Sequence, residues 1–323
     1  MKILVVKMSS MGDVIHTLPA LTDASNALEN LHFDWVVEEG FAEIPRWHTR
    51  VDNVIPVALR RWRKQPLLAI QSGEVQHFFH KLRERQYDYI IDAQGLVKSA
   101  LLTGLSKGKR CGLDFNSARE PLAALFYQQR NKVAKAEHAV TRTRQLFSQI
   151  LNYPLPTEMP HYGIDTQRLK SHPTLANLAE KTLLFIHGTS RDNKCWPEAH
   201  WIELGNLAHQ AGYTVQIVWG NEEERQRSER IAAACPSAKV TPKLKLAEVA
   251  ALLSQTKAAV AVDTGLGHLA AALGTPTISL YGPTDPKLIG AYGPSQTHLS
   301  AFNDIDNSMT NLFPERIWAT LQL

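Results

Sequence analysis

Short apolar runs alternate with amphipathic stretches along the whole chain, and this alternation restricts the fold more than any other feature. The runs predict strands at residues 3–6, 33–37, 53–57, 89–91, 182–186, 215–219, 239–240, 258–262 and 277–280. Helical periodicity predicts helices at 17–28, 76–85, 198–211, 223–233, 246–254 and 268–273. Strands separated by helices form parallel sheets with helices on both faces, so the predicted fold class is α/β.

A proline-rich segment divides the chain of 323 residues into two halves. It reads "NYPLPTEMPHYGIDTQRLKSHPTLAN", and prolines at this density oppose regular helix. We predict a first domain over 1–152, a linker over 153–178, a second domain over 179–310, and a helix over 311–323 that could pack on the first domain. Two doubly wound domains of this kind would face each other across a cleft, with ligands at the carboxyl ends of the strands.

The stretch "KMSSMGDVIHTLPAL" follows the first predicted strand. It lacks the G-x-G-x-x-G pattern of a dinucleotide-binding turn, and Asp13 would repel a phosphate there. A carboxylate at this position suits abstraction of a proton from a hydroxyl group, with Lys7 keeping the carboxylate ionised. The same pairing lowers its basicity, so proton transfer would coincide with bond formation. The alternative is that Asp13 only caps the next helix and that Lys7 balances its charge.

In the second half, "FIHGTSRDNKCWP" predicts part of a phosphate site. It places the hydroxyl groups of Thr189 and Ser190 and the ammonium group of Lys194 just after a strand. Hydroxyl groups and one cation can bind a phosphate without a metal. The alternative is an ordinary loop with a surface lysine.

The stretch "VAVDTGLGHLAAALGTP" predicts the other part of this site. A strand ends at Asp263, and Thr264 and Gly265 lead into a helix whose first amide groups can bind an anion. The alternatives are that Asp263 caps this helix and that His268 is structural.

An acidic run, "VWGNEEER", follows another strand, and an acid there can hold ribose hydroxyl groups. Glu222 is the best placed of its three acids, although such a run is also a plain helix start.

A basic cluster, "RRWRK" at residues 60–64, could bind a nucleic acid, an anionic lipid surface or a phosphorylated sugar. Residues 1–150 carry 21 Lys and Arg against 15 Asp and Glu, which also suggests an anionic partner. No RNA-recognition or helix-turn-helix motif accompanies the cluster, so nucleic acid is disfavoured. The alternative is a solvated basic loop. Further candidates for binding anions are Lys98, Arg119, His138, Arg142 and Arg144.

Other features exclude several classes of protein. The three cysteines lack metal-ligand spacing, which indicates free thiols in a reducing cytoplasm and no zinc site. No apolar run has the length of a signal peptide or a membrane helix. The D-x-D sequence at residues 304–306 is interpreted as a turn, so we expect Lys194 and helix amides, without a metal, to stabilise a leaving diphosphate.

Eight motifs in consistent order carry a resemblance over essentially the full chain: "KMSSMGDVIHTLPAL", "FDWVVEEGF", "IPVALRRWRK", "IDAQGLVKSALL", "AREPLAALFY", "RDNKCWPEAHW", "VDTGLGHLAAAL" and "YGPTDPKLIG". The chain resembles the bacterial lipopolysaccharide heptosyltransferases of glycosyltransferase family 9, in particular the heptosyltransferase I type. The resemblance implies a GT-B fold, that is, two Rossmann-like domains facing across a cleft. It implies inverting transfer of L-glycero-D-manno-heptose from ADP-heptose to the inner 3-deoxy-manno-octulosonic acid (Kdo) of Kdo2-lipid A.

The resemblance also implies roles for matching residues. Asp13 would be the general base, assisted by Lys7, and Lys194 would also be catalytic. The donor would contact Thr189, Ser190, Lys194, Glu222, Leu244, Asp263, Thr264, Gly265 and His268. The acceptor would contact Arg60, Arg61, Lys64 and Arg119, and we add Lys98 and His138 as candidates. We further expect no metal or cofactor, a monomer, and a cytoplasmic enzyme bound peripherally to the inner membrane.

The chain departs from the family pattern at Gly188, Ser190 and Gly267, and its acidic run is short, so Glu223 and Glu224 remain alternatives to Glu222. Rival functions are heptosyltransferase II or III, or a related sugar-nucleotide epimerase. A dehydrogenase is disfavoured because no G-x-G-x-x-G follows a strand. From a different class, the chain could be a non-catalytic module that binds anionic lipid.

Overall fold

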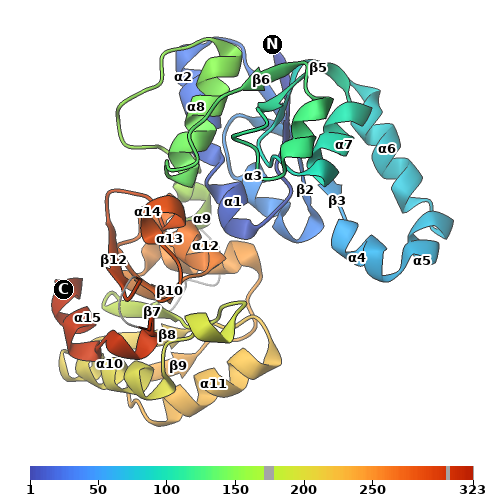
Figure 1. Cartoon of the computed structure of the whole chain (residues 1–323). Coiled ribbons are helices and arrows are strands. Elements are labelled where there is room, and N and C mark those ends of the chain that lie inside the picture. The colour runs from blue at the N-terminus through green and yellow to red at the C-terminus, as the bar shows by residue number, and fades with distance from the viewer. Residues whose placement is uncertain (171–177, 303–305, 323) are drawn as a thin grey trace. The chain divides into compact units, whose positions relative to one another are not determined.

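A computed structural model describes residues 1–170, 178–302 and 306–322. The chain forms two compact units, Met1–Ile164 and Asp165–Leu323, each built on one six-stranded parallel sheet (Figure 1). The division lies inside the predicted linker, of which residues 171–177 are outside the described part. The predicted α/β class and the two sheets are thereby confirmed.

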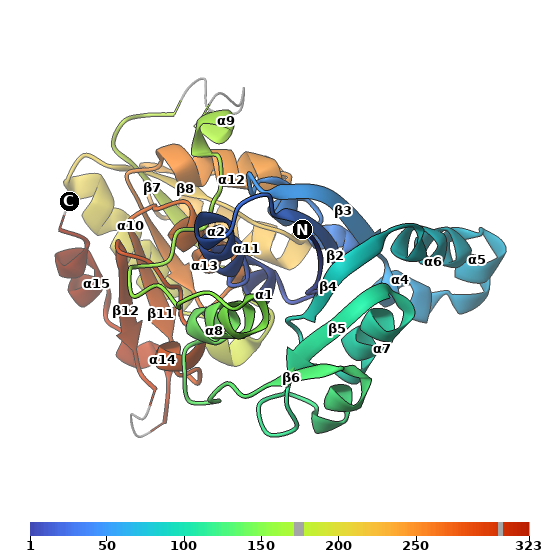
Figure 2. The same ribbon diagram turned by 90° about the horizontal axis from the view of Figure 1, so that it is seen from above.

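The sheet of the first unit has the strand order β3-β2-β1-β4-β5-β6. Its order reverses between β1 and β4, so the carboxyl ends of these two strands form the place where α/β sheets bind ligands. In Figure 2, α2 and α8 lie on one side of this sheet and α6 and α7 on the other. The strands are β1 (Lys2–Val6), β2 (His32–Glu38), β3 (Val51–Val57), β4 (Gln86–Asp92), β5 (Lys107–Leu113) and β6 (Gln129–Asn131). The α-helices are α1 (Met11–Ile15), α2 (Leu18–Ala27), α3 (Glu43–Arg46), α4 (Leu59–Lys64), α5 (Pro66–Gln71), α6 (Glu74–Glu84), α7 (Val97–Leu105) and α8 (Ala139–Leu151).

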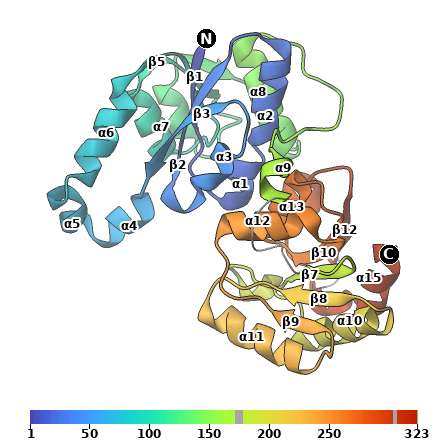
Figure 3. The same ribbon diagram turned by 180° about the vertical axis from the view of Figure 1, so that it is seen from behind.

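The sheet of the second unit has the order β12-β11-β10-β7-β8-β9 and reverses between β10 and β7. Figure 3 shows α12 and α13 on one face of this sheet and α10 and α11 on the other. The strands are β7 (Thr182–Ile186), β8 (Thr214–Ile217), β9 (Ala238–Val240), β10 (Ala258–Val262), β11 (Thr277–Tyr281) and β12 (Gln296–Ser300). The α-helices are α9 (Thr166–Lys170), α10 (Glu198–Gln210), α11 (Glu222–Ala233), α12 (Leu246–Gln255), α13 (Gly265–Ala272), α14 (Pro286–Ile289) and α15 (Pro314–Leu321).

The strands that the pattern predicts all exist, whereas β5, β6 and β12 were not predicted. These three lie toward or at the edges of the sheets, and the first half of β5 reads Lys-Gly-Lys-Arg. Because such strands are only half covered, they lack the continuous apolar run that marks a central parallel strand.

The packing of the last helix, α15, differs from the prediction. Residues 311–323 were expected to form a helix that could pack on the first domain, but α15 packs on α10 and β11 of the second unit. Ile317 is fully buried in that unit's core, and the ring of Trp318 lies 6.0 Å from the ring of Tyr213. The apolar side of α15 is therefore satisfied within its own unit.

Each unit has a separate hydrophobic core. Buried side chains of β1, β2 and α6 meet in the first, and those of β7, β10 and α10 meet in the second. Burial of this apolar surface fixes the strand ends, and hence the polar residues that follow them. Within the described residues, no helix is both long and apolar enough to cross a membrane.

Candidate functional site

The strand–turn–helix at β1 and α1 positions Asp13. Residues 3–6 are fully buried, which anchors the strand, and Ser10 then begins α1 as its N-cap. The Asp13 Oδ2 atom accepts hydrogen bonds from the backbone N–H and the hydroxyl group of Ser10, at 2.8 and 2.9 Å. Asp13 Oδ1 lies 3.8 Å from the Lys7 ammonium group. Asp13 thus takes part in the helix cap and lies beside Lys7, and its role as a base stays a prediction.

The surroundings of Asp13 keep its carboxylate ionised. Burial alone would raise its pKa, but the Lys7 ammonium group, the two Ser10 hydrogen bonds and the Arg119 guanidinium group together lower it. Arg119, a predicted acceptor residue on an exposed loop, therefore lies within electrostatic reach of the predicted base. Lys7 and Arg119 thus both act on the charge of this carboxylate.

Lys7 is fixed in place although it is charged. Its side chain is largely buried, and its ammonium group donates a hydrogen bond to the carbonyl oxygen of Ala93 at 2.9 Å. The Trp35 indole N–H donates to the Lys7 carbonyl oxygen at 3.0 Å. An ammonium group tied to one carbonyl and one carboxylate acts as a preorganised positive charge beside Asp13.

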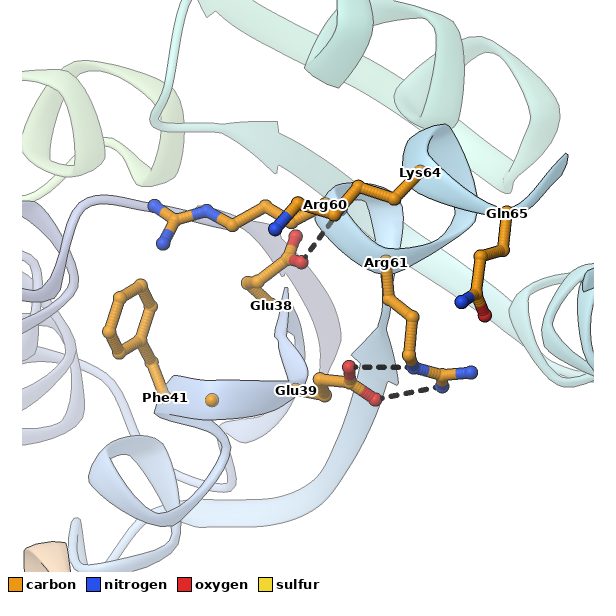
Figure 4. Close-up of a pocket in the computed structure, with 8 residues that line it drawn as sticks. Glu38, Glu39, Phe41, Arg60, Arg61, Lys64 and Gln65 are labelled. Carbon is orange, nitrogen blue, oxygen red and sulfur yellow. Dashed lines mark hydrogen bonds and ion pairs between the residues drawn. The ribbon is translucent and has the colours of Figure 1, made fainter. Parts of the chain in front are cut away.

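The basic cluster at residues 60–64 forms α4 and lines a cavity of about 430 Å³. Figure 4 shows the Arg60 side chain beside the Phe41 ring, and the guanidinium carbon lies 5.4 Å from the ring centroid. Lys64 and Gln65 line the same cavity from the helix side. Glu38, which is buried, accepts a hydrogen bond from the backbone N–H of Arg60 at 3.0 Å and so fixes the start of α4.

Arg61 has a different role from Arg60 and Lys64. Its guanidinium group binds both carboxylate oxygens of Glu39, at 3.1 and 3.0 Å, and Glu74 at 2.9 Å (Figure 4 shows the Glu39 pair). The Glu74 carboxylate also accepts a hydrogen bond from the Trp62 indole at 3.0 Å. Arg61, predicted as an acceptor residue, lines the same cavity and joins α4 to η1 (Glu39–Phe41) and α6.

The other two acceptor candidates of the first unit occupy different environments. Lys98 is exposed in the first turn of α7. His138 is the N-cap of α8 and accepts a hydrogen bond from the backbone N–H of Val140 at 3.2 Å. Its ring is buried and lies 5.5 Å from the ring of His16. His138 is thus built into the start of a helix, whereas Lys98 is open to solvent.

In the second unit, the ends of β7 and β10 bring the predicted donor residues together. The Lys194 ammonium group donates to Asp263 Oδ2 at 2.5 Å, and the Thr189 hydroxyl group donates to the Asp263 carbonyl oxygen at 2.9 Å. Ser190 is exposed beside Thr189. Asp263 is nearly buried, so this ion pair holds Lys194 over the end of the sheet.

The start of α13 adds backbone donors to the same sheet edge. Thr264 is its N-cap and Gly265 its first residue, three positions earlier than the predicted start. The first amide groups of a helix are free to bind an anion. His268 is buried within this helix.

The three acids of the α11 run point to different places. Glu222 is exposed and pairs with Arg225 and Gln226 on its own helix, and these hydrogen bonds lower its pKa to about 2. Glu223 pairs with Arg227. Glu224 instead accepts the Gly220 N–H at 2.7 Å, and its carboxylate fills the space beside Gly188, where an added Cβ would come within 2.5 Å. The structure therefore favours Glu224 over Glu222 as the acid at the strand ends.

Two predicted features remain, Leu244 and the D-x-D sequence at residues 304–306. Leu244 is half-buried in the segment after β9, where the Trp219 indole N–H donates to the Thr241 carbonyl oxygen at 2.7 Å. Of the D-x-D sequence, residues 304 and 305 lie outside the described part, and Asp306 accepts a hydrogen bond from the Ser308 N–H at 2.9 Å, as in a turn. Among the described residues, no three His, Cys, Asp or Glu side chains gather as a metal site requires.

Comparisons with known proteins place these features in a family. The model of glycosyltransferase family 9 (heptosyltransferase) matches residues 75–314. Lipopolysaccharide heptosyltransferase 1 of Pseudomonas aeruginosa is 53% identical over 302 residues, which cover 93% of this chain and 84% of that protein. The solved structure of E. coli heptosyltransferase WaaC with ADP matches with a TM-score of 0.93 and 47% identity, covering 100% of this chain and 99% of that one.

A second solved structure, E. coli WaaC with ADP-2-deoxy-2-fluoro heptose, matches with a TM-score of 0.90 and 46% identity, again over 100% of this chain and 99% of that one. These likenesses confirm the GT-B fold class.

Proposed function

The chain belongs to glycosyltransferase family 9, and from this premise we propose that it transfers L-glycero-D-manno-heptose from ADP-heptose to the inner Kdo of Kdo2-lipid A. The similar proteins are named as heptosyltransferases, and the solved ones hold ADP or an ADP-heptose analogue. The observation that carries the proposal is the ionised Asp13 carboxylate at the end of β1, in a unit whose first turn lacks a phosphate-binding glycine pattern.

In this proposal Asp13 is the general base. Asp13 Oδ2 is occupied by Ser10, whereas Oδ1 has no hydrogen bond to Lys7, because their separation is 3.8 Å. Oδ1 accepts the proton of the Kdo hydroxyl group while the oxygen of this hydroxyl group bonds to the anomeric carbon of heptose. The bond from this carbon to the diphosphate oxygen breaks on the opposite face, which inverts the configuration. Since the pKa of Asp13 is lowered, deprotonation accompanies attack and does not precede it.

On the donor side, the diphosphate gains negative charge as the bond breaks. Lys194, the hydroxyl groups of Thr189 and Ser190, and the α13 amides at Gly265 are the groups that stabilise this charge, and no metal is required. We assign the ribose hydroxyl groups to the Glu224 carboxylate and the adenine to the backbone near Leu244.

On the acceptor side, Arg60 and Lys64 bind the acidic sugars of Kdo2-lipid A, and Arg119 adds a charge near Asp13. Arg60 and Lys64 present cations on a cavity wall that also contains the Phe41 ring, a surface suited to a sugar with a carboxylate. Arg61 positions α4 for this contact. Lys98 and His138 stay candidates.

Peripheral membrane association, as a monomer, is the remaining part of the proposal. Leu67, Leu68 and Ile70 of α5 are 73%, 57% and 55% exposed, directly after the basic α4. Exposed aliphatic side chains beside a basic cluster fit an anionic bilayer surface. Sedimentation with vesicles of phosphatidylglycerol and phosphatidylethanolamine tests this association. We expect L67Q/L68Q to bind the vesicles more weakly than wild type. The control is L288Q, which replaces an exposed leucine of the second unit and should leave binding unchanged. Equal binding of all three proteins would contradict it.

The function itself is tested by ADP release from ADP-heptose, with and without Kdo2-lipid A, in the presence of a chelator. We expect release that depends on the acceptor and persists in the chelator. Release without acceptor would favour an epimerase. Release only with a heptosylated acceptor would favour heptosyltransferase II or III. Lipid binding without any ADP-sugar response would favour the non-catalytic module.

A further inference from the structure

Gln94, two residues beyond the end of β4, has no role in the reaction described so far. Strand β4 lies beside β1 in the sheet, and Gln94 is buried just beyond the carboxyl end of β4. Its Oε1 atom accepts hydrogen bonds from the backbone N–H groups of Met8 at 2.7 Å and Ser9 at 3.2 Å. Its Nε2 atom donates to the carbonyl oxygen of Ser9 at 2.5 Å. One side chain therefore binds three backbone groups of the segment that joins Lys7 to Asp13.

Only one orientation of the Gln94 amide satisfies these contacts. Exchange of Oε1 and Nε2 would face N–H groups with N–H groups and a carbonyl with a carbonyl. The partners fix the amide orientation and leave no alternative pairing. This specificity separates Gln94 from a side chain that only fills space.

Gln94 is itself held by a buried acid. Asp92 is fully buried, and its Oδ1 atom accepts hydrogen bonds from the backbone N–H groups of Gln94 at 2.9 Å and Gly95 at 3.0 Å. The Tyr127 hydroxyl group donates to Asp92 Oδ2 at 2.8 Å. Because Asp92 is held by Tyr127 and in turn binds the backbone of Gln94 and Gly95, the turn is a rigid support for the Gln94 side chain.

The same turn, residues 92–95, also binds the Lys7 ammonium group and the loop that carries Arg119. The Ala93 carbonyl oxygen accepts the Lys7 ammonium hydrogen bond, and the Gly95 carbonyl oxygen accepts the backbone N–H of Glu120, next to Arg119. The turn thus contacts the chain just before the predicted base, at Lys7, Met8 and Ser9, and the loop that carries Arg119.

We infer that Gln94 is a positioning residue, which holds the backbone at Met8 and Ser9 and thereby places the Asp13 carboxylate for proton transfer. The inference rests on the proposed function for its kinetic consequence. The Gln94 side chain is buried, and its hydrogen bonds all go to backbone groups. It acts through three hydrogen bonds to the backbone before α1, and a misplacement of about 1 Å at a reacting group can lower a rate by roughly 10²-fold.

The sharpest test is Gln94→Glu, which keeps the shape of the side chain. One carboxylate oxygen of Glu can still accept from Met8 and Ser9, but the other faces the Ser9 carbonyl oxygen where Nε2 now donates. That contact is repulsive unless the new carboxyl group is protonated. We therefore expect kcat of Q94E to be about tenfold or more below wild type at pH 8 and to recover partly as the pH is lowered. The KM for ADP-heptose stays unchanged.

The control is Gln149→Glu, because Gln149 Nε2 also donates to a backbone carbonyl, that of Lys132, but on the exposed side of α8. Q149E should keep the wild-type kcat and pH profile. Gln94→Ala, which removes all three hydrogen bonds, should lower kcat by about 10²-fold at every pH while ADP binding persists.

A second readout does not require turnover. The ¹³C resonance of the Asp13 carboxyl group is titrated in wild type and Q94A. The pKa of Asp13 should rise toward its ordinary value in Q94A, because the carboxylate moves away from the Lys7 ammonium group and the Ser10 donors. If wild type transfers no heptose, the proposed function fails and this titration still decides the role of Gln94. The inference is overturned if Q94E and Q94A keep kcat within twofold of wild type and the pKa of Asp13 does not move. It is also overturned if both variants are unfolded at every pH, because Gln94 would then be a general determinant of the fold.

Discussion

At the scale of the residue, the two oxygens of Asp13 have different tasks. Oδ2 is saturated by Ser10 and sets the direction of the carboxylate, while Oδ1 faces Lys7 at a distance longer than a hydrogen bond. A capped carboxylate is less free to rotate than an exposed one, so the cap preorganises the base. The helix-capping role therefore supports the proposed catalytic role.

Removal of the Lys7 charge should shift the pH dependence of kcat/KM. Because the pKa of Asp13 is lowered in the folded protein, its carboxylate is protonated only below the ordinary range of about 3.9, and activity through the base is lost only there. Lys7→Met removes a charge that lowers this pKa, so the acid limb of kcat/KM should move to higher pH. The comparison is with Lys2→Met, an exposed lysine of β1. An unmoved limb in K7M would show that Lys7 does not act on the base.

The α11 acids give a second prediction at this scale. Glu224→Gln should raise the KM for ADP-heptose by about 10–100-fold, as loss of a charged hydrogen bond of about 1.5–3 kcal/mol implies. Glu222→Gln is the matched control and should change the KM less than twofold, because Glu222 pairs with Arg225 on the outer side of α11. Steady-state kinetics on both variants check this, and the reverse ranking would restore Glu222 to the donor site.

Single residues also show what the sequence can reveal. Asp13, Lys194 and Asp263 could be singled out because each lies in the segment between an apolar strand and the next helix or in its first turn, where ligand sites of α/β sheets lie. Gln94 follows a strand too, yet its partners are backbone groups 85 and 86 positions away, which no local pattern encodes. The sequence alone favours Glu222 over Glu224. Which of the two acids faces the strand ends depends on the residue at which α11 begins, and the structure shows that Asn221 is its N-cap.

At the scale of the element, α4 is a short helix held from three sides. Glu38 binds its first turn, while Arg61 joins it to Glu39 and Glu74. These ion pairs are close to half exposed, and exposed pairs contribute only about 0–1 kcal/mol to stability. Their effect is therefore on the direction of α4, which carries Arg60 and Lys64.

Glu74→Gln tests this positioning. We expect the melting temperature to change little and the KM for Kdo2-lipid A to rise several-fold, with the KM for ADP-heptose unchanged. Glu84→Gln, at the exposed end of α6, is the control. A large loss of stability with an unaltered acceptor KM would mean that Glu74 stabilises the fold and does not position α4.

Helix α15 gives a prediction about stability. Ile317 is fully buried in the core of the second unit, so Ile317→Ala should lower the free energy of unfolding by about 2–5 kcal/mol. Arg316→Ala, on the exposed side of the same helix, should change it by less than about 0.5 kcal/mol. Denaturant titration of both variants decides the matter, and equal stabilities would contradict the packing of α15 on α10.

Elements with a continuous apolar run or strong helical periodicity could be predicted from the sequence, as β1, β7, β10 and α10 show. The polar edge strand β12 could not, because only pairing with β11 makes it a strand. The same limit applies to α15: its apolar side was visible, but the sequence does not say which unit would cover it.

At the scale of the whole molecule, the two units have different chemistry on similar sheets. The first presents a carboxylate and cations at its strand ends, and the second presents an ammonium group, hydroxyl groups and helix amides. The strand order reverses beside β1, which leads to Asp13, in the first sheet, and between β10 and β7, which lead to Asp263 and Lys194, in the second. The proposed mechanism therefore assigns the acceptor and the base to the first unit and the donor to the second.

The most direct test of this claim is Asp13→Asn, with ADP-heptose binding and heptose transfer measured side by side. Asn keeps the shape of the side chain but cannot take the proton. We predict ADP-heptose affinity within twofold of wild type by calorimetry and a kcat lowered by about 10²–10⁴-fold. Near-normal turnover in D13N, with binding intact, would contradict the assignment of Asp13 as the base.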